Sequence, residues 1–293
     1  MEKSKVYFTK EISKEKIVEM FKVLNKELKG NVAVKIHSGE KDNQNYLRPE
    51  FLEPIIDYVN GTVVECNTAY EGERDTTEKH LKLMEDHNWS KHFNVDILDS
   101  EGPDLVLENK EGKIIKKNYV GKNIVNYNSV LVISHFKGHP MGGYGGALKQ
   151  LAIGFASSKG KRYIHCTGKE NGSYEDMFEV EQIKFLESMA DAAKSVVDYF
   201  KDNIVYINIM CNMSVDCDCC SKAKDPCMKD IGILSSTDPV ALDKACIDLV
   251  YNSSDSGKNY LIERIESRHG THTIDAACEL GIGLKEYELI EVE

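Results

Sequence analysis

Short apolar strands alternate with amphipathic helical stretches in the first part of this chain, and this rhythm constrains the fold more than any other feature. Residues 31–36 (NVAVKI) and 62–66 (TVVEC) have the pattern of buried strands. Helical periodicity marks residues 13–28 and 49–59. Alternation of strand and helix is typical of a parallel sheet covered by helices. The sequence therefore predicts an α/β protein with a mainly parallel sheet flanked by helices.

Three short segments depart from this rhythm. They lie at 95–99, 104–108 and 113–117, and turn-forming Gly-Pro and Glu-Gly pairs separate them. We interpret them as a small β-hairpin insertion or an antiparallel edge. Regular patterns then return, with strands expected at 130–134, 203–210, 231–234 and 286–292 and helices at 175–202, 239–250 and 259–267.

No repeat or long linker divides the 293 residues. We expect one α/β domain over 1–293, either uniform or with a small lobe at about 205–293 that carries a cysteine loop.

Charge and hydropathy limit the partners and the compartment. The chain has 37 basic and 48 acidic residues, and a net charge of −11 disfavours nucleic acid or an anionic membrane as its partner. It has no apolar run of about 18 residues and no apolar signal-peptide core at its start. We expect a cytoplasmic protein that meets a small-molecule ligand or a redox partner protein, and the sequence leaves its oligomeric state open.

Five of the nine cysteines fall between residues 211 and 227. An odd number of cysteines without a secretion signal argues against a disulfide framework. Thiolates from a short irregular loop are typical of iron–sulfur sites, whereas zinc is usually held by paired knuckles that this spacing lacks. The loop therefore predicts an iron–sulfur cluster, with zinc as the alternative. The candidate ligands are Cys217, Cys219 and Cys227, with Cys220 and Cys211 competing for the fourth place.

A segment rich in histidine and glycine follows the strand at 130–134. His135, His139 and His165 could bind a metal ion or act as acid and base. We expect His165 at the end of a short strand. Lys149, in the first turn of a helix, can hold an anion or act as an amine nucleophile.

Glycines in the same segment favour close approach of the backbone to a ligand. The candidates for cofactor binding are Gly142, Gly143, Gly145 and Gly146. Further polar side chains lie at or just after predicted strand ends, where an α/β site is lined: His37, Arg48, Glu65 and Arg74.

Three motifs carry a resemblance to a known family: HFKGHPMGGYGGALKQLAIGFAS at 135–157, DCDC at 216–219 and DIGILSSTDPVALDKACIDL at 230–249. Over nearly its whole length the chain resembles the family of domain of unknown function 362, whose members are often labelled iron–sulfur-centre proteins. That resemblance implies a 4Fe–4S cluster at Cys217 and Cys219, with Cys227 or Cys220 contributing.

A shorter resemblance covers residues 139–165, which are similar to the lactate racemase family with its nickel-pincer nucleotide. That resemblance implies a catalytic role for His139, a covalent cofactor link at Lys149 and nickel binding at His165. The serine that this family has in its glycine turn is replaced here by Gly145 or Tyr144, and His80 is a loose candidate for the family's other catalytic histidine.

Three functions are open at this point. The first is an iron–sulfur enzyme for redox or acid/base chemistry on a small anionic ligand, with His135, His139, Lys149 and His165 lining its pocket. The second is a non-catalytic electron-transfer or metal-carrier module. The third is an isomerase-like enzyme with a metal or covalent cofactor at Lys149 and His165.

Overall fold

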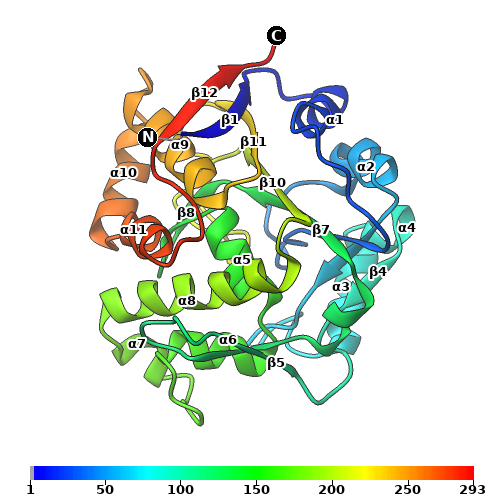
Figure 1. The fold of residues 1–293 in the computed structure, drawn as a ribbon, viewed down its shortest axis with the longest axis vertical. Helices are drawn as coiled ribbons and strands as arrows, with labels where there is room; N and C mark the ends of the chain where they lie inside the picture. The colour runs from blue at the N-terminus through cyan, green and yellow to red at the C-terminus, as the bar shows by residue number, and fades with distance from the viewer. Residues whose placement is uncertain (1–2) are drawn as a thin grey trace.

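A computed structural model describes residues 3–293 of the chain and shows an α/β fold built on one large sheet (Figure 1). The eight strands of this sheet follow the order β12-β1-β11-β10-β7-β2-β3-β4. They are β1 (Ser4–Thr9), β2 (Val32–Lys35), β3 (Gly61–Glu65), β4 (Val95–Ile97), β7 (Ser129–His135), β10 (Ile204–Met210), β11 (Gly232–Ser236) and β12 (Tyr287–Glu291). Within this sheet only β11 runs against its neighbours, so the predicted mainly parallel sheet is confirmed.

Helices cover both faces of the sheet because successive residues of its central strands point to opposite sides. Val130 and Val132 of β7 belong to one apolar cluster, and Leu131 and Ile133 to the other. Helices α1 (Lys14–Lys22), α2 (Pro49–Tyr58), α3 (Thr77–Asp86) and α4 (Trp89–His92) contribute to the second cluster. The first cluster takes in α5 (Ala147–Phe155), α6 (Ser158–His165), α8 (Gln182–Phe200), α9 (Pro239–Asn252), α10 (Lys258–Ser267) and α11 (His272–Glu279).

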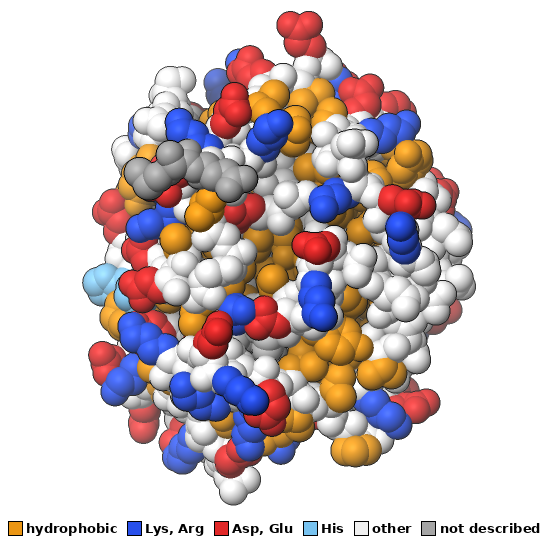
Figure 2. Space-filling view, viewed as in Figure 1, with side chains coloured by type: hydrophobic (Ala, Val, Ile, Leu, Met, Phe, Trp, Pro, Cys, Tyr) orange, Lys and Arg blue, Asp and Glu red, His pale blue; other side chains and the backbone are white. Residues whose placement is uncertain are grey.

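Local signals in the sequence explain where several helices begin. The Ser13 side chain accepts a hydrogen bond from the Lys16 N–H at 3.2 Å and caps α1. Asp238 caps α9 by accepting from two backbone N–H groups, and Pro239 fills its first turn, as expected. The surface seen in Figure 2 mixes basic, acidic and apolar side chains. Within residues 3–293, no helix is both long enough and apolar enough to cross a membrane.

The predicted hairpin insertion is present, but its strands differ from those expected. β5 (Leu105–Glu108) pairs antiparallel with β6 (Lys117–Val120). The segment 113–117 is mostly the connecting loop, because the buried Asp191 carboxylate accepts its backbone N–H groups and holds it away from a ladder. The segment 95–99 contains β4, which pairs parallel with β3 and is an edge of the main sheet.

Two other local predictions were wrong. His165 ends helix α6 rather than a strand, because Ser157 caps that helix through a 3.0 Å hydrogen bond from the Gly160 N–H. The helix expected at 175–202 is two helices, α7 (Asp176–Glu179) and α8, which are separated near Val180.

The sheet topology places chemically active segments at one edge. β2, β3, β7 and β10 run parallel, so their carboxyl ends lie together. The chain proceeds from β2 to β3 on one side and later adds β7 on the other, and a sheet of this kind opens a crevice at such a reversal. A small hairpin of β8 (Lys137–His139) and β9 (Gly143–Gly145) leaves β7 there, and the cysteine loop leaves β10. A short 3₁₀ helix, η1 (Lys122–Asn126), precedes β7.

Candidate metal centre and ligand pocket

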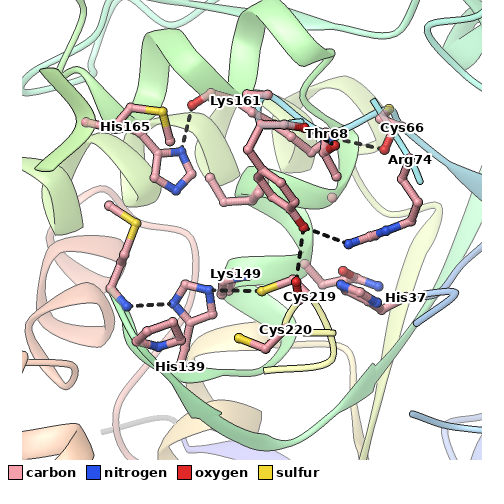
Figure 3. Close-up of a pocket in the computed structure, with 18 of the residues that line it drawn as sticks. His37, Cys66, Thr68, Arg74, His139, Lys149, Lys161, His165, Cys219 and Cys220 are labelled. Atoms are coloured by element: carbon pink, nitrogen blue, oxygen red, sulfur yellow. Dashed lines mark hydrogen bonds between the residues drawn. The ribbon is translucent and has the colours of Figure 1, made fainter. Parts of the chain in front are cut away.

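A cavity of about 310 Å³ opens at this edge of the sheet (Figure 3). Its lining comes from segments that are distant in the sequence but follow neighbouring strands. The chemically active lining residues are His37, Glu65, Cys66, Tyr70, Arg74, His139, Lys149, Lys161, His165, Cys219 and Cys220. The pairing of β7 with β10 therefore brings the histidine segment and the cysteine loop together in space.

Three potential metal-ligand atoms cluster at the wall of this cavity. The donor atoms of His139, Cys217 and Cys219 all lie within 4.8 Å of one another. His139 Nε2 is 3.9 Å from the Cys219 sulfur. Tetrahedral zinc with bonds of about 2.0 Å to nitrogen and 2.3 Å to sulfur would separate such a pair by roughly 3.5 Å. The group therefore suits one metal ion, and two thiolates with one imidazole is a ligand set that catalytic zinc sites use.

Cys220 belongs to the same group of thiols, whereas Cys227 does not. A hydrogen bond with Cys219 lowers the pKa of Cys220, and the contact between Cys217 and Cys219 raises the pKa of Cys217. The Cys227 sulfur instead contacts the Met213 carbonyl at 3.2 Å. Three contacting thiols within four residues are thus available to a metal centre, and a cluster held by four thiolates would need one more.

The hydrogen bonds of His139 determine which of its ring nitrogens carries hydrogen. Its Nδ1 accepts from the backbone N–H groups of Met141 at 3.2 Å and Gly142 at 2.9 Å. Burial, aided by the charge of Lys149, lowers the pKa of His139 to about 4, so the ring is neutral near pH 7. The hydrogen therefore lies on Nε2, which points at Cys219. As it stands, His139 is a hydrogen-bond donor to a thiolate or a ligand, and it would bind metal only after losing that hydrogen.

His165, on the other side of the cavity, carries its hydrogen on Nδ1 instead of Nε2 (Figure 3). Its Nδ1 donates to the Lys161 carbonyl at 2.7 Å, and its ring stacks on Phe185. Burial lowers the pKa of His165 to about 4. The unprotonated nitrogen is therefore Nε2, and an imidazole held through Nδ1 in this way is the usual form of a metal ligand.

Cations outnumber anions around the cavity. The Lys149 side chain reaches it without a hydrogen-bond or ion-pair partner among residues 3–293. Lys161 is buried and donates only to the carbonyls of Cys66 and Ala156, and burial lowers its pKa. The carboxylate of Glu65 is already paired, at 2.6 Å, with the buried Lys35. The cavity therefore favours an anionic ligand.

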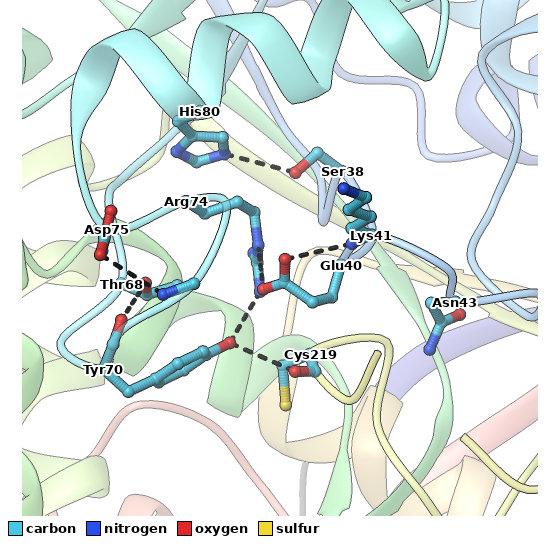
Figure 4. Close-up of polar contacts among 12 residues, drawn as sticks. Ser38, Glu40, Lys41, Asn43, Thr68, Tyr70, Arg74, Asp75, His80 and Cys219 are labelled. Carbon is cyan, nitrogen blue, oxygen red and sulfur yellow. Dashed lines mark hydrogen bonds and ion pairs between the residues drawn. The ribbon is translucent and has the colours of Figure 1, made fainter. Parts of the chain in front are cut away.

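Segments after β2 and β3 fix the cysteine loop through its backbone (Figure 4). The Asn43 amide donates to the carbonyls of Cys220 at 2.8 Å and Cys217 at 3.4 Å. The Tyr70 hydroxyl donates to the Cys219 carbonyl at 3.3 Å and accepts from Arg74 at 2.9 Å. These contacts hold the loop that carries the thiols without using a thiol.

His135 does not line the large cavity, but lines a smaller one beside it. Its Nδ1 faces the Asp218 carboxylate at 2.9 Å and its Nε2 faces the Cys211 carbonyl at 2.6 Å. Both ring nitrogens are therefore already engaged by acceptors. Lys137 pairs with the same carboxylate at 2.8 Å. The catalytic role of His135 stays a prediction.

The glycines of the segment shape the turn around the pocket. Gly142 provides an N–H to His139, and Gly143 has φ +81° and packs on Gly270. Gly145 and Gly146 lie beside a smaller cavity that adjoins the main one.

Some site residues were foreseen and others were missed. His37, Glu65 and Arg74 line the cavity as strand-end residues should, whereas Arg48 stacks on the Tyr46 ring. His80 is buried against Asn67 and Ser38 behind the cavity.

Tyr70, Lys161 and Asn43 were not singled out. Tyr70 and Asn43 lie in loops after β3 and β2, and that position was the available signal. Lys161 reaches the pocket from a helix that was not predicted.

Comparisons with known proteins place this geometry in context. The family described as domain of unknown function 362 matches residues 32–248. Among solved structures, the lactate racemase apoprotein of Thermoanaerobacterium thermosaccharolyticum aligns with 15% identity and a TM-score of 0.48, covering 85% of this chain and 58% of that one. A Thermotoga maritima protein aligns with 12% identity and a TM-score of 0.46, covering 80% and 58%.

This chain thus spans 58% of the length of both solved structures, and likeness at this level carries no argument about activity. The search of curated proteins found no match.

Proposed function

This chain belongs to the family of domain of unknown function 362, and we propose that its cavity is the active site of a metal-dependent enzyme acting on a small anionic ligand. The observation that carries the proposal is the group of contacting thiols of Cys217, Cys219 and Cys220, which lies with His139 beside a cationic cavity.

Cys217, Cys219 and Cys220 would hold the metal in this proposal. Contacting thiols favour soft metal centres, namely an iron–sulfur cluster or zinc. We propose that the thiols hold an iron–sulfur cluster of the 4Fe–4S type, with zinc as the alternative. An iron–sulfur cluster would supply one-electron redox chemistry or a Lewis-acidic iron, and zinc would supply a Lewis acid alone.

The protein's own groups have separate roles. Lys149 would attract and orient the anion, because it has no ion-pair partner among the described residues. Arg74 also lines the cavity, but it is already paired with Glu40 at 3.1 Å and lies 3.9 Å from Glu65. His139 would donate its Nε2 hydrogen to a thiolate or to the ligand. Cys217 is buried, and Cys219 and Cys220 are partly exposed toward the cavity.

Metal and acid-labile sulfide analysis of anaerobically purified protein tests the metal centre. We expect about four iron and four sulfide per chain, with both lost in Cys217→Ser. Stoichiometric zinc without sulfide would show that the metal centre is zinc and not an iron–sulfur cluster. Protein that binds neither metal would refute the proposal.

A second function is favoured by one specific observation, the orientation of His165. Its free Nε2 points into the same cavity that the unpartnered Lys149 amine reaches, and this combination suits an isomerase-like enzyme with a metal or covalent cofactor there. The intact mass of the native protein tests it. A mass above that of the chain, lost in Lys149→Ala, would support this function, and an unmodified mass after expression in the native host would contradict it.

A further inference from the structure

A second cavity, of about 20 Å³, lies between the end of β7 and the first turn of α5. It shares His37, Lys149 and Gln150 with the large cavity, so the two adjoin. This volume is enough for one water molecule or one oxygen atom of a larger group, since a water needs roughly 10–15 Å³.

Two polar side chains at this small cavity have no hydrogen-bond partner. They are the hydroxyl of Ser134, a residue that is 4% exposed, and the Nε2 amide group of Gln150. Buried polar atoms without a partner are uncommon in native proteins and usually indicate a missing ligand or water. Both atoms can donate a hydrogen bond.

The charges around the small cavity are mainly positive. Lys149 has no partner among the described residues, and Lys137 uses one of its three hydrogens on Asp218. The Asp218 carboxylate is already held by Lys137 and His135.

The turn before α5 leaves the space open. A Cβ atom at position 145 would lie 3.5 Å from Cε of Lys137, within the space that glycine leaves empty. The first N–H groups of α5, those of Ala147 and Leu148, are taken by the Asp243 carboxylate, which lies against Gly146. The side-chain donors of Ser134 and Gln150 remain without partners at the cavity.

We infer that the small cavity is an oxyanion subsite, in which Ser134, Gln150 and Lys149 take one oxygen of the ligand's carboxylate or phosphate group. The rest of the ligand then extends into the large cavity toward the thiols. This inference rests on the proposed function, and it assigns the ligand's anionic end to the β7 side of the pocket.

The variants Ser134→Ala and Gln150→Glu test the subsite in the full-length protein. The probes are inorganic phosphate and acetate, titrated by calorimetry and by thermal unfolding. A hydrogen bond to a charged group is commonly worth about a tenfold change in affinity, so we expect Ser134→Ala to bind the preferred anion about tenfold more weakly. Gln150→Glu should weaken binding further, because it replaces the donor with a carboxylate that repels the anion. The anion that binds more tightly identifies the group as phosphate or carboxylate.

Ser129→Ala is the matched control because Ser129 lies at the other end of β7 and its hydroxyl donates to the Lys29 carbonyl at 2.9 Å. Without anion, Ser129→Ala should lower the unfolding temperature, whereas Ser134→Ala should not, since its hydroxyl has no partner. With anion, only Ser134→Ala should lose the stabilisation that the anion gives.

The outcomes separate the two proposals. Anion binding that is equally tight in wild type and Ser134→Ala would overturn the subsite and leave a water molecule as its occupant. Absence of anion binding in the wild type would overturn both the subsite and the anionic ligand of the proposed function.

Discussion

Replacing Asn43 by aspartate should loosen the cysteine loop without touching a thiol. Asn43 is 4% exposed, and its amide nitrogen donates to the Cys217 and Cys220 carbonyls. Its side-chain oxygen accepts from the backbone N–H groups of Asn45 at 2.8 Å and Tyr46 at 3.1 Å. Asn43→Asp keeps this second pair of bonds and removes the first.

The magnitude follows from those two lost donors. Each leaves a carbonyl without its partner and facing a carboxylate, at a cost of about 1–3 kcal/mol per unsatisfied group. The weaker bond, at 3.4 Å, contributes least. We therefore expect the free energy of unfolding to fall by about 2–4 kcal/mol. Loss of a group that orients metal ligands commonly weakens metal binding by roughly 10- to 100-fold.

Urea unfolding followed by circular dichroism measures the first effect, and competition with a metal chelator measures the second. Asn31→Asp is the matched control, because the Asn31 amide also donates to a backbone carbonyl, that of Asn126, at an exposed site away from the loop. The reasoning is refuted if Asn43→Asp binds metal as tightly as wild type.

Three further predictions concern other parts of the site. Lys35→Met should lower the free energy of unfolding by about 3–5 kcal/mol, because it removes the closest cationic partner of the buried Glu65 carboxylate. A loss below about 1 kcal/mol in urea unfolding would contradict this. In chelator-treated protein, stability should fall as pH drops from about 6.5, the unfolded pKa of histidine, to about 4, because unfolded His165 binds a proton that the folded residue does not. Its share is about 3 kcal/mol, and His165→Gln should remove that share of the pH dependence, while His139 and His80, whose pKa values burial also lowers, keep theirs. Cys219→Ser should lose the metal whereas Cys227→Ser should keep it, and metal analysis showing equal loss in both would place Cys227 among the ligands.

The sequence predicted the fold well where apolar patterns were long. Residues 204–210 and 129–135 are buried throughout, and a continuous apolar run of this length bounded by turns is typical of a strand covered on both faces. β1 was missed because its half-buried Ser4 and exposed Lys5 break the apolar pattern at a strand near the sheet edge. His165 was assigned to a strand because Tyr163 and Ile164 favour strands, although Ser157 gives the helix a good cap.

The site was predictable by residue type but not by arrangement. The histidines, Lys149 and the cysteine loop stand out in the sequence because their chemistry is unusual for their setting. Their distance in space depends on which strands are neighbours, and the pairing of β7 with β10 joins segments that nothing local in the sequence connects. The state of each histidine depends on single backbone contacts, such as that between His165 and the Lys161 carbonyl, which spacing alone does not reveal.

The pairing of β7 with β10 also sets an order of events during synthesis. His139 and Lys149 leave the ribosome well before the thiols at 217–220, and Asn43 and Tyr70, which hold those thiols, leave earlier still. A growing chain that stops short of β10 has Lys149 and the other cationic side chains of the pocket but lacks the thiols that complete its lining. A metal held by the thiols at 217–220 would therefore be captured only once the chain has been made through β10, so metal content would report that this part of the fold is complete.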